Sequence, residues 1–369
     1  MDEVVLFSVY FPFLLAALLG WLFIPRVLIL SHRKRLFDMP DERKTHDAPV
    51  PRLGGITFLP ILLICVCLMT GIWANKGMPF QILGLDILVI RFVLLFVGMM
   101  ILYLVGVVDD LIGVSYQAKF LVQITSAIFF PLSGLWIHDL SGLFWINEIP
   151  AWVGIPLTVF IVVYVTNAIN LIDGVDGLAA GICFVAFLTL GLAAKGHCIL
   201  MIVAFGMLGI LLPFWSYNVF GNIEKGHKIF MGDTGSLTLG YLVSFFLIYM
   251  ASGSGVAFPR EMLIIGLSTM AVPMFDIVRV VMARIRNHRN PFLPDKNHIH
   301  HKLLRTGIGS RWVMAIIVLV SLCIILVTKC CVDLRIGNTW IVLIDVAIWL
   351  VFDYTVNYFI HHNHRLRYE

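Results

Sequence analysis

The sequence predicts an all-α polytopic integral membrane protein with about eleven transmembrane helices. Hydrophobic residues make up 60% of the 369 residues and charged residues only 13%, whereas soluble domains average about 25% charged residues. The mean hydropathy of +0.95 excludes one large soluble core. The apolar residues also fall into segments near the ~20 residues that cross about 30 Å of hydrocarbon as a helix.

Eleven such segments follow one another, and we interpret residues 1–369 as a single transmembrane domain. The first is too long for a signal-peptide core, so it is expected to remain as a helix. No internal repeat is evident, which weakens the case for an inverted-repeat transporter. The segments are residues 4–29, 53–74, 87–108, 119–137, 150–168, 178–194, 198–217, 235–252, 261–283, 312–328 and 337–360.

The distribution of lysine and arginine predicts the orientation. The loops and helix ends on one side hold 20 of the 26 basic residues, and the other side holds the remaining six. The positive-inside rule makes the richer side cytoplasmic, with the N-terminus outside and the C-terminus in the cytoplasm. Four polar motifs fall on this cytoplasmic side, which favours a site where a water-soluble substrate meets the lipid.

The first motif is VVDDLIGV, in which Asp109 and Asp110 end the third apolar segment. Adjacent carboxylates repel each other, and a cation relieves that repulsion. Mg²⁺ is commonly held by one or two carboxylates together with substrate phosphates. The alternative is a solvated helix end without a ligand.

The second motif is NAINLIDGVDGLAAG, with Asn170, Asp173 and Asp176 at three-residue spacing. On a helix this spacing places them on one face, and Gly174 and Gly177 allow a turn or a close ligand approach. The alternative is a capping turn with Asp176 as the N-cap of the next helix. Capping does not readily explain Asp173.

The third motif, FMGDTGS, runs from Phe230 to Ser236 in front of an apolar helix. Helix N-termini bind phosphate well, and the carboxylate of Asp233 at this place indicates a metal-bridged diphosphate. Phe230 is a candidate for stacking on a base. The alternative is that Asp233 only caps the helix.

The fourth motif, HIHH, contributes His298, His300 and His301 within the loop 284–311. Arg284 and Arg286 help to make this loop cationic, as an anionic substrate requires. With carboxylates available for Mg²⁺, we assign the histidines to phosphate and interpret residues 284–311 as a loop that recognises sugar and diphosphate. A basic, solvated loop is the alternative.

These four motifs, with RKTH and PRLGG in the first cytoplasmic loop, resemble the polyprenyl-phosphate N-acetylhexosamine-1-phosphate transferases, glycosyltransferase family 4. Their order and spacing match along nearly the whole chain. The resemblance implies one transmembrane catalytic domain in the cytoplasmic membrane of a bacterium. It also implies transfer of GlcNAc-1-phosphate from UDP-GlcNAc to undecaprenyl phosphate, giving undecaprenyl-diphospho-GlcNAc and UMP. This reaction starts cell-surface polysaccharides of the O-antigen, common-antigen or teichoic-acid type.

The resemblance also implies roles for the acidic residues. Asp233 resembles the principal ligand of Mg²⁺ (or Mn²⁺), with Asp110 beside it in the metal and phosphate network. Asp109 resembles the residue that deprotonates or orients the lipid phosphate. Lys119 matches a lysine near that phosphate.

On the donor side, Asn170, Asp173 and Phe230 resemble the uridine contacts, and Asp176 resembles a residue of the same nucleotide site. A second group, found in or next to the loop 284–311, is expected to bind the diphosphate and sugar. Its members are His298, His300, His301 and Arg284 or Arg286.

The expected partners are UDP-GlcNAc, undecaprenyl phosphate, the lipid bilayer and a second copy of the chain, without nucleic acid. Two alternatives remain open. One is the same reaction with another UDP-N-acetylhexosamine or a muramoyl-pentapeptide donor. The more remote one is a secondary transporter, which would more often place its carboxylates at mid-membrane.

Overall fold

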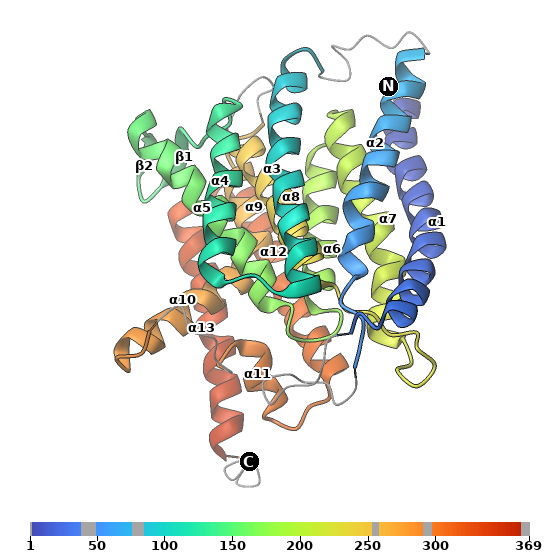
Figure 1. The fold of residues 1–369 in the computed structure, drawn as a ribbon. Coiled ribbons are helices and arrows are strands. Elements are labelled where there is room, and N and C mark those ends of the chain that lie inside the picture. Colours follow the sequence, from blue (N-terminus) through green and yellow to red (C-terminus); the bar gives the residue numbers. More distant parts are fainter. Residues whose placement is uncertain (1, 38–48, 76–84, 253–257, 291–296, 363–369) are drawn as a thin grey trace.

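Helices dominate the structure, a computed structural model that describes residues 2–37, 49–75, 85–252, 258–290 and 297–362 (Figure 1). The RKTH motif, Lys76 and part of the loop 284–311 (residues 291–296) lie outside the described residues. The helices are α1 (Asp2–Lys34), α2 (Phe58–Asn75), α3 (Leu85–Ile112), α4 (Tyr116–Leu132), α5 (Ala151–Ile172), α6 (Leu178–Ala193), α7 (Cys198–Phe220), α8 (Gly232–Ala251), α9 (Met262–Thr269), α10 (Ala271–Arg286), α11 (Ile299–Leu304), α12 (Ser310–Asp333) and α13 (Asn338–His362). A 3₁₀ turn, η1 (Gly54–Thr57), precedes α2, and the strands are β1 (Asp139–Leu143) and β2 (Ile146–Glu148).

Each of the eleven apolar segments is helical over most of its length. Eight helices among the described residues are long and apolar enough to cross a membrane, and α9 with α10 makes a ninth candidate. The helices α4 and α6 are shorter, with 17 and 16 residues. The protein is therefore a polytopic membrane protein built from helices.

The expectation of one continuous helix over residues 261–283 is wrong. The chain breaks at Met270, and α9 and α10 meet there at an angle of 65°. Pro273 explains the break, because proline lacks an N–H and its ring collides with the carbonyl four residues earlier, that of Thr269. The helix α10 then runs to Arg286.

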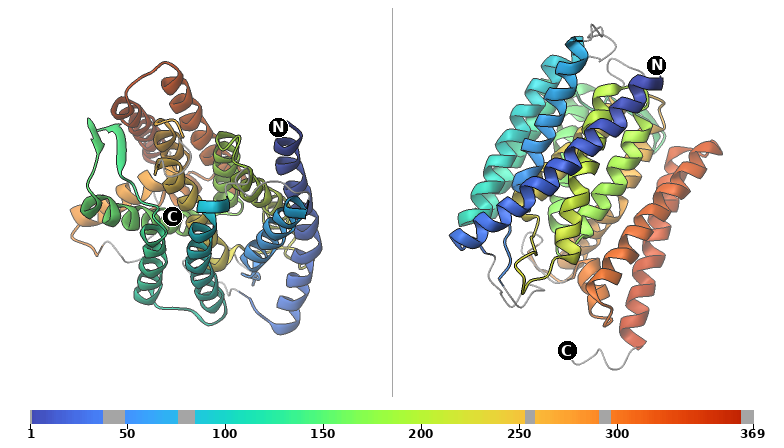
Figure 2. Two further views of the ribbon diagram at one scale, coloured as in Figure 1. Left: turned by 90° about the horizontal axis from the view of Figure 1, so that it is seen from above. Right: turned by 90° about the vertical axis from the view of Figure 1, so that its right-hand side faces the viewer.

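A second departure from the all-α expectation is an antiparallel hairpin formed by β1 and β2, in which Asp139 pairs with Glu148 and Leu143 with Ile146. It lies at the edge of the bundle, at the end away from α11 and the end of α13, as Figure 1 and Figure 2 show. Its two turn residues, Phe144 and Trp145, carry no Asn-Gly or Asp-Gly signal.

The helix α8 lies at the centre of the bundle. In its most apolar stretch 94% of the residues are buried, whereas in that of α13 only 28% are. The helix α8 packs between α3 and α5. The approach of α3 is close enough that a Cβ on Gly106 would lie 2.5 Å from the Cα of Thr234. Because α3 ends where α8 begins, this contact brings the end of the VVDDLIGV motif onto the start of FMGDTGS.

Candidate active site

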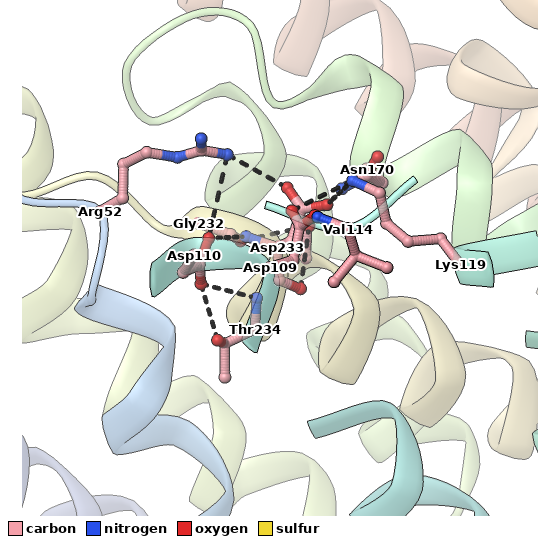
Figure 3. Close-up of polar contacts among 10 residues, drawn as sticks. Arg52, Asp109, Asp110, Val114, Lys119, Asn170, Gly232, Asp233 and Thr234 are labelled. Carbon is pink, nitrogen blue, oxygen red and sulfur yellow. Dashed lines mark hydrogen bonds and ion pairs between the residues drawn. The ribbon is translucent and has the colours of Figure 1, made fainter. Parts of the chain in front are cut away.

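The carboxylates that the sequence singled out meet at the end of α3 (Figure 3). Asp109 and Asp233 are each 8% exposed. One carboxylate oxygen from each of Asp109, Asp110 and Asp233 lies within 4.8 Å of the others, a grouping that could hold a metal ion. Motifs separated by 123 residues in the chain thus form one acidic cluster.

Asp110 holds the first turn of α8. Its Oδ1 accepts a hydrogen bond of 2.8 Å from the backbone N–H of Asp233, and its Oδ2 accepts bonds from the N–H of Thr234 at 3.0 Å and from its hydroxyl at 2.6 Å. The first N–H groups of a helix have no partner within the helix. A residue of α3 therefore caps α8, which makes Asp110 a positioning residue for Asp233.

Asp233 lies between two cations. The Lys119 ammonium is 2.7 Å from its Oδ2, and the Arg52 guanidinium is 3.3 Å from its Oδ1. The same ammonium is 3.1 Å from Oδ2 of Asp109, whose Oδ1 accepts a 2.7 Å bond from the N–H of Val114. Lys119 thus joins the two carboxylates expected to face the metal and the lipid phosphate.

The segment around Arg52 is part of the site: Arg52 lies in the PRLGG motif that contributes to the family resemblance, although no role was predicted for it. Gly54 and Gly55 donate backbone hydrogen bonds to the carbonyls of Phe230 and Met231 at 2.9 and 2.8 Å. Phe230 in turn donates to Pro51 at 2.7 Å and is half-buried just before α8. These bonds fix Arg52 beside Asp233 and Asp110. The Arg52 guanidinium is 3.8 Å from Oδ1 of Asp110.

The second motif forms the turn between α5 and α6, beside the acidic cluster. Asn170, on α5, donates a 2.8 Å hydrogen bond to Ser236 on α8. Asp173 is half-buried, and its burial together with the nearby carboxylate of Asp233 raises its pKa well above the usual range. The position of Asp173 beside the acidic cluster thus disfavours its ionised form.

Asp176 does not cap α6, so that alternative is wrong: the N-cap is Gly177, with a φ of 74°. The carboxylate of Asp176 instead lies 2.5 Å from the Lys228 ammonium. Asn218, which was not among the predicted site residues, holds the turn by accepting a hydrogen bond from the N–H of Gly177 at 2.5 Å and donating one to the carbonyl of Ile229 at 2.7 Å. An asparagine at the end of an apolar helix was the available signal.

The histidine motif reaches the same turn from the other side. His298 is 2.8 Å from Oδ2 of Asp276, and the N–H of Ile299 donates to Oδ1 of Asp276 at 3.0 Å. Asp276 also forms an ion pair of 2.7 Å with Arg279, three residues later on the same helix. Asp276 thus anchors the motif to α10 as well as pairing within that helix.

His300 lies against Gly174. A Cβ added to Gly174 would lie 2.4 Å from Nε2 of His300. Its ring packs next to that of His301, with centroids 4.3 Å apart. His300 is 1% exposed, and its Nδ1 has no hydrogen-bond partner among the described residues. At the end of α10, Arg284 is buried and Arg286 is exposed, which distinguishes the two arginines that the sequence left as alternatives.

The pH dependence of stability tests the burial of His300. Burial and the neighbouring His301 and His298 lower the pKa of His300 to about 3. A histidine whose pKa is lower in the folded state stabilises the protein above about pH 6.5, and this contribution is lost as the pH falls toward 3. We expect His300→Gln to flatten the decline in melting temperature between about pH 7.5 and pH 5.

The exposed His288 provides the control for this experiment. The variant His288→Gln should decline with pH as the unaltered protein does. Equal declines in all three proteins would contradict the role given to His300.

The charges of the cluster suit a divalent cation. Asp109, Asp110 and Asp233 carry three negative charges if all are ionised, against two positive charges on Arg52 and Lys119. The oxygens are hard ligands of the type Mg²⁺ prefers, and such sites use one or two carboxylates together with substrate phosphates. Asp233 is the best placed as a ligand, because its oxygens contact the side-chain cations of Lys119 and Arg52, whereas those of Asp110 bind the start of α8 and one of Asp109 accepts from the N–H of Val114.

Fold and site together define a polytopic membrane protein that gathers carboxylates and cations at one end of a helical bundle. Residues 92–251 match the glycosyl transferase family 4 model. The chain is 32% identical over 318 residues to a probable undecaprenyl-phosphate N-acetylglucosaminyl 1-phosphate transferase of Bacillus subtilis, covering 85% of this chain and 82% of that protein.

Two further relatives are undecaprenyl-phosphate alpha-N-acetylglucosaminyl 1-phosphate transferases. The one from Yersinia pestis is 29% identical, with 82% of this chain and 78% of the relative covered. The one from Escherichia coli K12 is 30% identical, with 78% and 74% covered. The chain belongs to glycosyl transferase family 4, as the motifs indicated.

Proposed function

We propose that this protein transfers GlcNAc-1-phosphate from UDP-GlcNAc to undecaprenyl phosphate, giving undecaprenyl-diphospho-GlcNAc and UMP. The observation that carries the proposal is the cluster of Asp109, Asp233, Lys119 and Arg52 at one end of an apolar bundle. A lipid acceptor and a water-soluble donor can meet there. The names of the relatives from three bacteria support the same acceptor and sugar.

The reaction joins two anions, so charge neutralisation and alignment matter more than a strong base. A phosphomonoester has a second pKa near 6, so the lipid phosphate is mostly dianionic at neutral pH. Lys119 attracts that phosphate, and Asp109, held at 3.1 Å from the Lys119 ammonium, orients it. Direct attack on the donor diphosphate then needs no covalent enzyme intermediate.

The donor lies along the turn between α5 and α6. Asn170, Asp173 and Phe230 contact the uridine, and Asp176 belongs to the same nucleotide site. His300 and His301 bind the diphosphate from the opposite side, with His298 holding them to Asp276. Arg284, the buried arginine of the pair, recognises the sugar in preference to Arg286.

Asp233 would hold Mg²⁺ or Mn²⁺, with Asp109 and Asp110 beside it. The metal would supply Lewis-acid stabilisation of the charge that develops on the donor diphosphate. Arg52 and Lys119 keep the Asp233 carboxylate in place from both sides.

We also propose that the chain crosses a bacterial cytoplasmic membrane eleven times, with the carboxylate cluster and the C-terminus on the cytoplasmic side. In Figure 1, α1 begins and α13 ends at opposite ends of the bundle, which supports an odd number of crossings. We further propose a homodimer, which crosslinking in intact membranes would test. The product would begin a cell-surface polysaccharide.

UMP release by the purified protein tests the function. With undecaprenyl phosphate, Mg²⁺ and a panel of UDP-sugars, we expect release with UDP-GlcNAc and complete loss on adding EDTA. Release only with another UDP-sugar would support the proposed reaction and contradict the proposal that UDP-GlcNAc is the donor. If folded protein released no UMP with any donor, the proposal that it is an enzyme would be contradicted and a transporter would be favoured.

A further inference from the structure

The hairpin at the far end of the bundle is firmly attached to the helices. Asn338 of α13 donates a 2.7 Å hydrogen bond to the carbonyl of Ser141, and the next residue, Thr339, accepts a 2.7 Å bond from the N–H of Phe144. The Thr339 hydroxyl also lies 3.2 Å from the carbonyl of Gly142. The start of α13 thus fixes where the tip of the hairpin points.

The two residues of the turn combine positive φ angles with bulky aromatic side chains, which is unusual. Phe144 and Trp145 have φ angles of 54° and 60°. A two-residue turn with both φ angles positive prefers Asn-Gly, because bulky residues in this region cost of order 1 kcal/mol or more each. Phe144 and Trp145 are also 57% and 77% exposed, so contacts with the described residues cover less than half of either one.

Other tryptophans gather at this end of the bundle. Trp152, the second residue of α5, is 78% exposed, and Trp340, the third residue of α13, is 58% exposed. Both mark the level at which an apolar helix begins. Tryptophan is enriched at this level in membrane proteins, because its ring is amphipathic and suits the headgroup region. Seen from above, the hairpin projects beyond the edge of the bundle (Figure 2).

We propose that Phe144 and Trp145, with Trp152 and Trp340, form an aromatic anchor in the lipid interface of the leaflet away from the carboxylate cluster. The hairpin carries Asp139 and Glu148 and no lysine or arginine, so its contact is with the amphipathic interface and needs no anionic headgroup. A second copy is a poorer occupant, because it would bring the same acidic hairpin, without lysine or arginine, to the contact.

Quenching by brominated lipid tests the anchor and is independent of the proposed reaction. The chain has nine tryptophans, so the contribution of Trp145 is the difference between the unaltered protein and Trp145→Phe. In zwitterionic vesicles with bromine near the headgroup end of the acyl chain, we expect this contribution to fall at least about twofold. Trp349, which is 3% exposed, is the buried control and should be quenched much less.

Absence of quenching at Trp145 would overturn the proposal. Unquenched emission at a long wavelength would place the ring in water, and unquenched emission at a short wavelength would place it against protein, as in a dimer.

A second variant separates anchoring from the folding of the turn. Phe144→Asn with Trp145→Gly supplies the residues this turn prefers, so the hairpin should remain formed. We nevertheless expect amide exchange over residues 139–148 to become about tenfold faster in a bilayer, because the anchor is lost. UMP release should change less than twofold. Unchanged or slower exchange would contradict the proposal.

Discussion

Replacing Asp233 with asparagine should reduce UMP release by about 10³-fold or more while the protein remains folded. Asp233 is the carboxylate that contacts both Lys119 and Arg52, at 2.7 and 3.3 Å, and it lies next to Asp109 and Asp110. Neutralising it removes the best-placed metal ligand and leaves two cations facing each other. The measurement is turnover under saturating donor and acceptor, with the melting temperature recorded in parallel.

Asp345→Asn is the matched control. Asp345 is also a buried carboxylate, but it lies between α12 and α13, where it accepts a 3.0 Å hydrogen bond from Thr328. Its replacement should leave turnover within about twofold of the unaltered protein, since it is no part of the acidic cluster. Near-normal turnover in Asp233→Asn would remove Asp233 from the metal site.

Replacing Gly232 with alanine should both destabilise the protein and inactivate it. Gly232 has a φ of 73°, and a Cβ there would lie 2.1 Å from the carbonyl oxygen of Arg52 and 2.5 Å from Oδ2 of Asp110. The backbone strain costs about 1 kcal/mol and the overlap about 1–3 kcal/mol more. Displacement of Asp110 would also shift the start of α8, and a shift near 1 Å can cost about 10²-fold in rate.

Gly113→Ala separates strain from crowding. Gly113 has a similar φ of 75°, but a Cβ there would meet nothing within 4 Å among the described residues. We expect only the backbone cost of about 1 kcal/mol and a small effect on UMP release. Thermal melting and UMP release of both variants check the prediction. Equal losses would show that strain, and not the contact with Arg52 and Asp110, governs the site.

The apolar segments were predictable from the sequence because hydrocarbon imposes a length on every helix. The meeting of Asp109 with Asp233 followed from placing their motifs on one side of the membrane. The capping role of Asp110 did not follow, because it depends on how far α3 reaches along α8, which the close contact at Gly106 sets. The role of Arg52 was not predicted, although the residue lies in the PRLGG motif, because nothing local to a basic loop shows which carboxylate an arginine will contact.

The remaining misses have different physical reasons. The bend at Met270 has a local cause in Pro273. It was not predicted because the residues on both sides of the break are apolar and together have the length of one transmembrane segment. The hairpin was missed because its turn uses Phe144 and Trp145 in place of the residues that such turns prefer. Membership of glycosyl transferase family 4 was correctly predicted from the order of the motifs.

The anchoring of the histidine motif has a consequence for how donor preference can change. His298 and Ile299 are held by Asp276 on α10, and Lys302 is held by Asp353 on α13 at 2.8 Å. The carboxylates are instead held together by α3 and α8 at the centre of the bundle. The residues proposed to face the sugar and the acidic cluster are therefore held by different helices, so a substitution on α10 or α13 can alter the first without displacing the second.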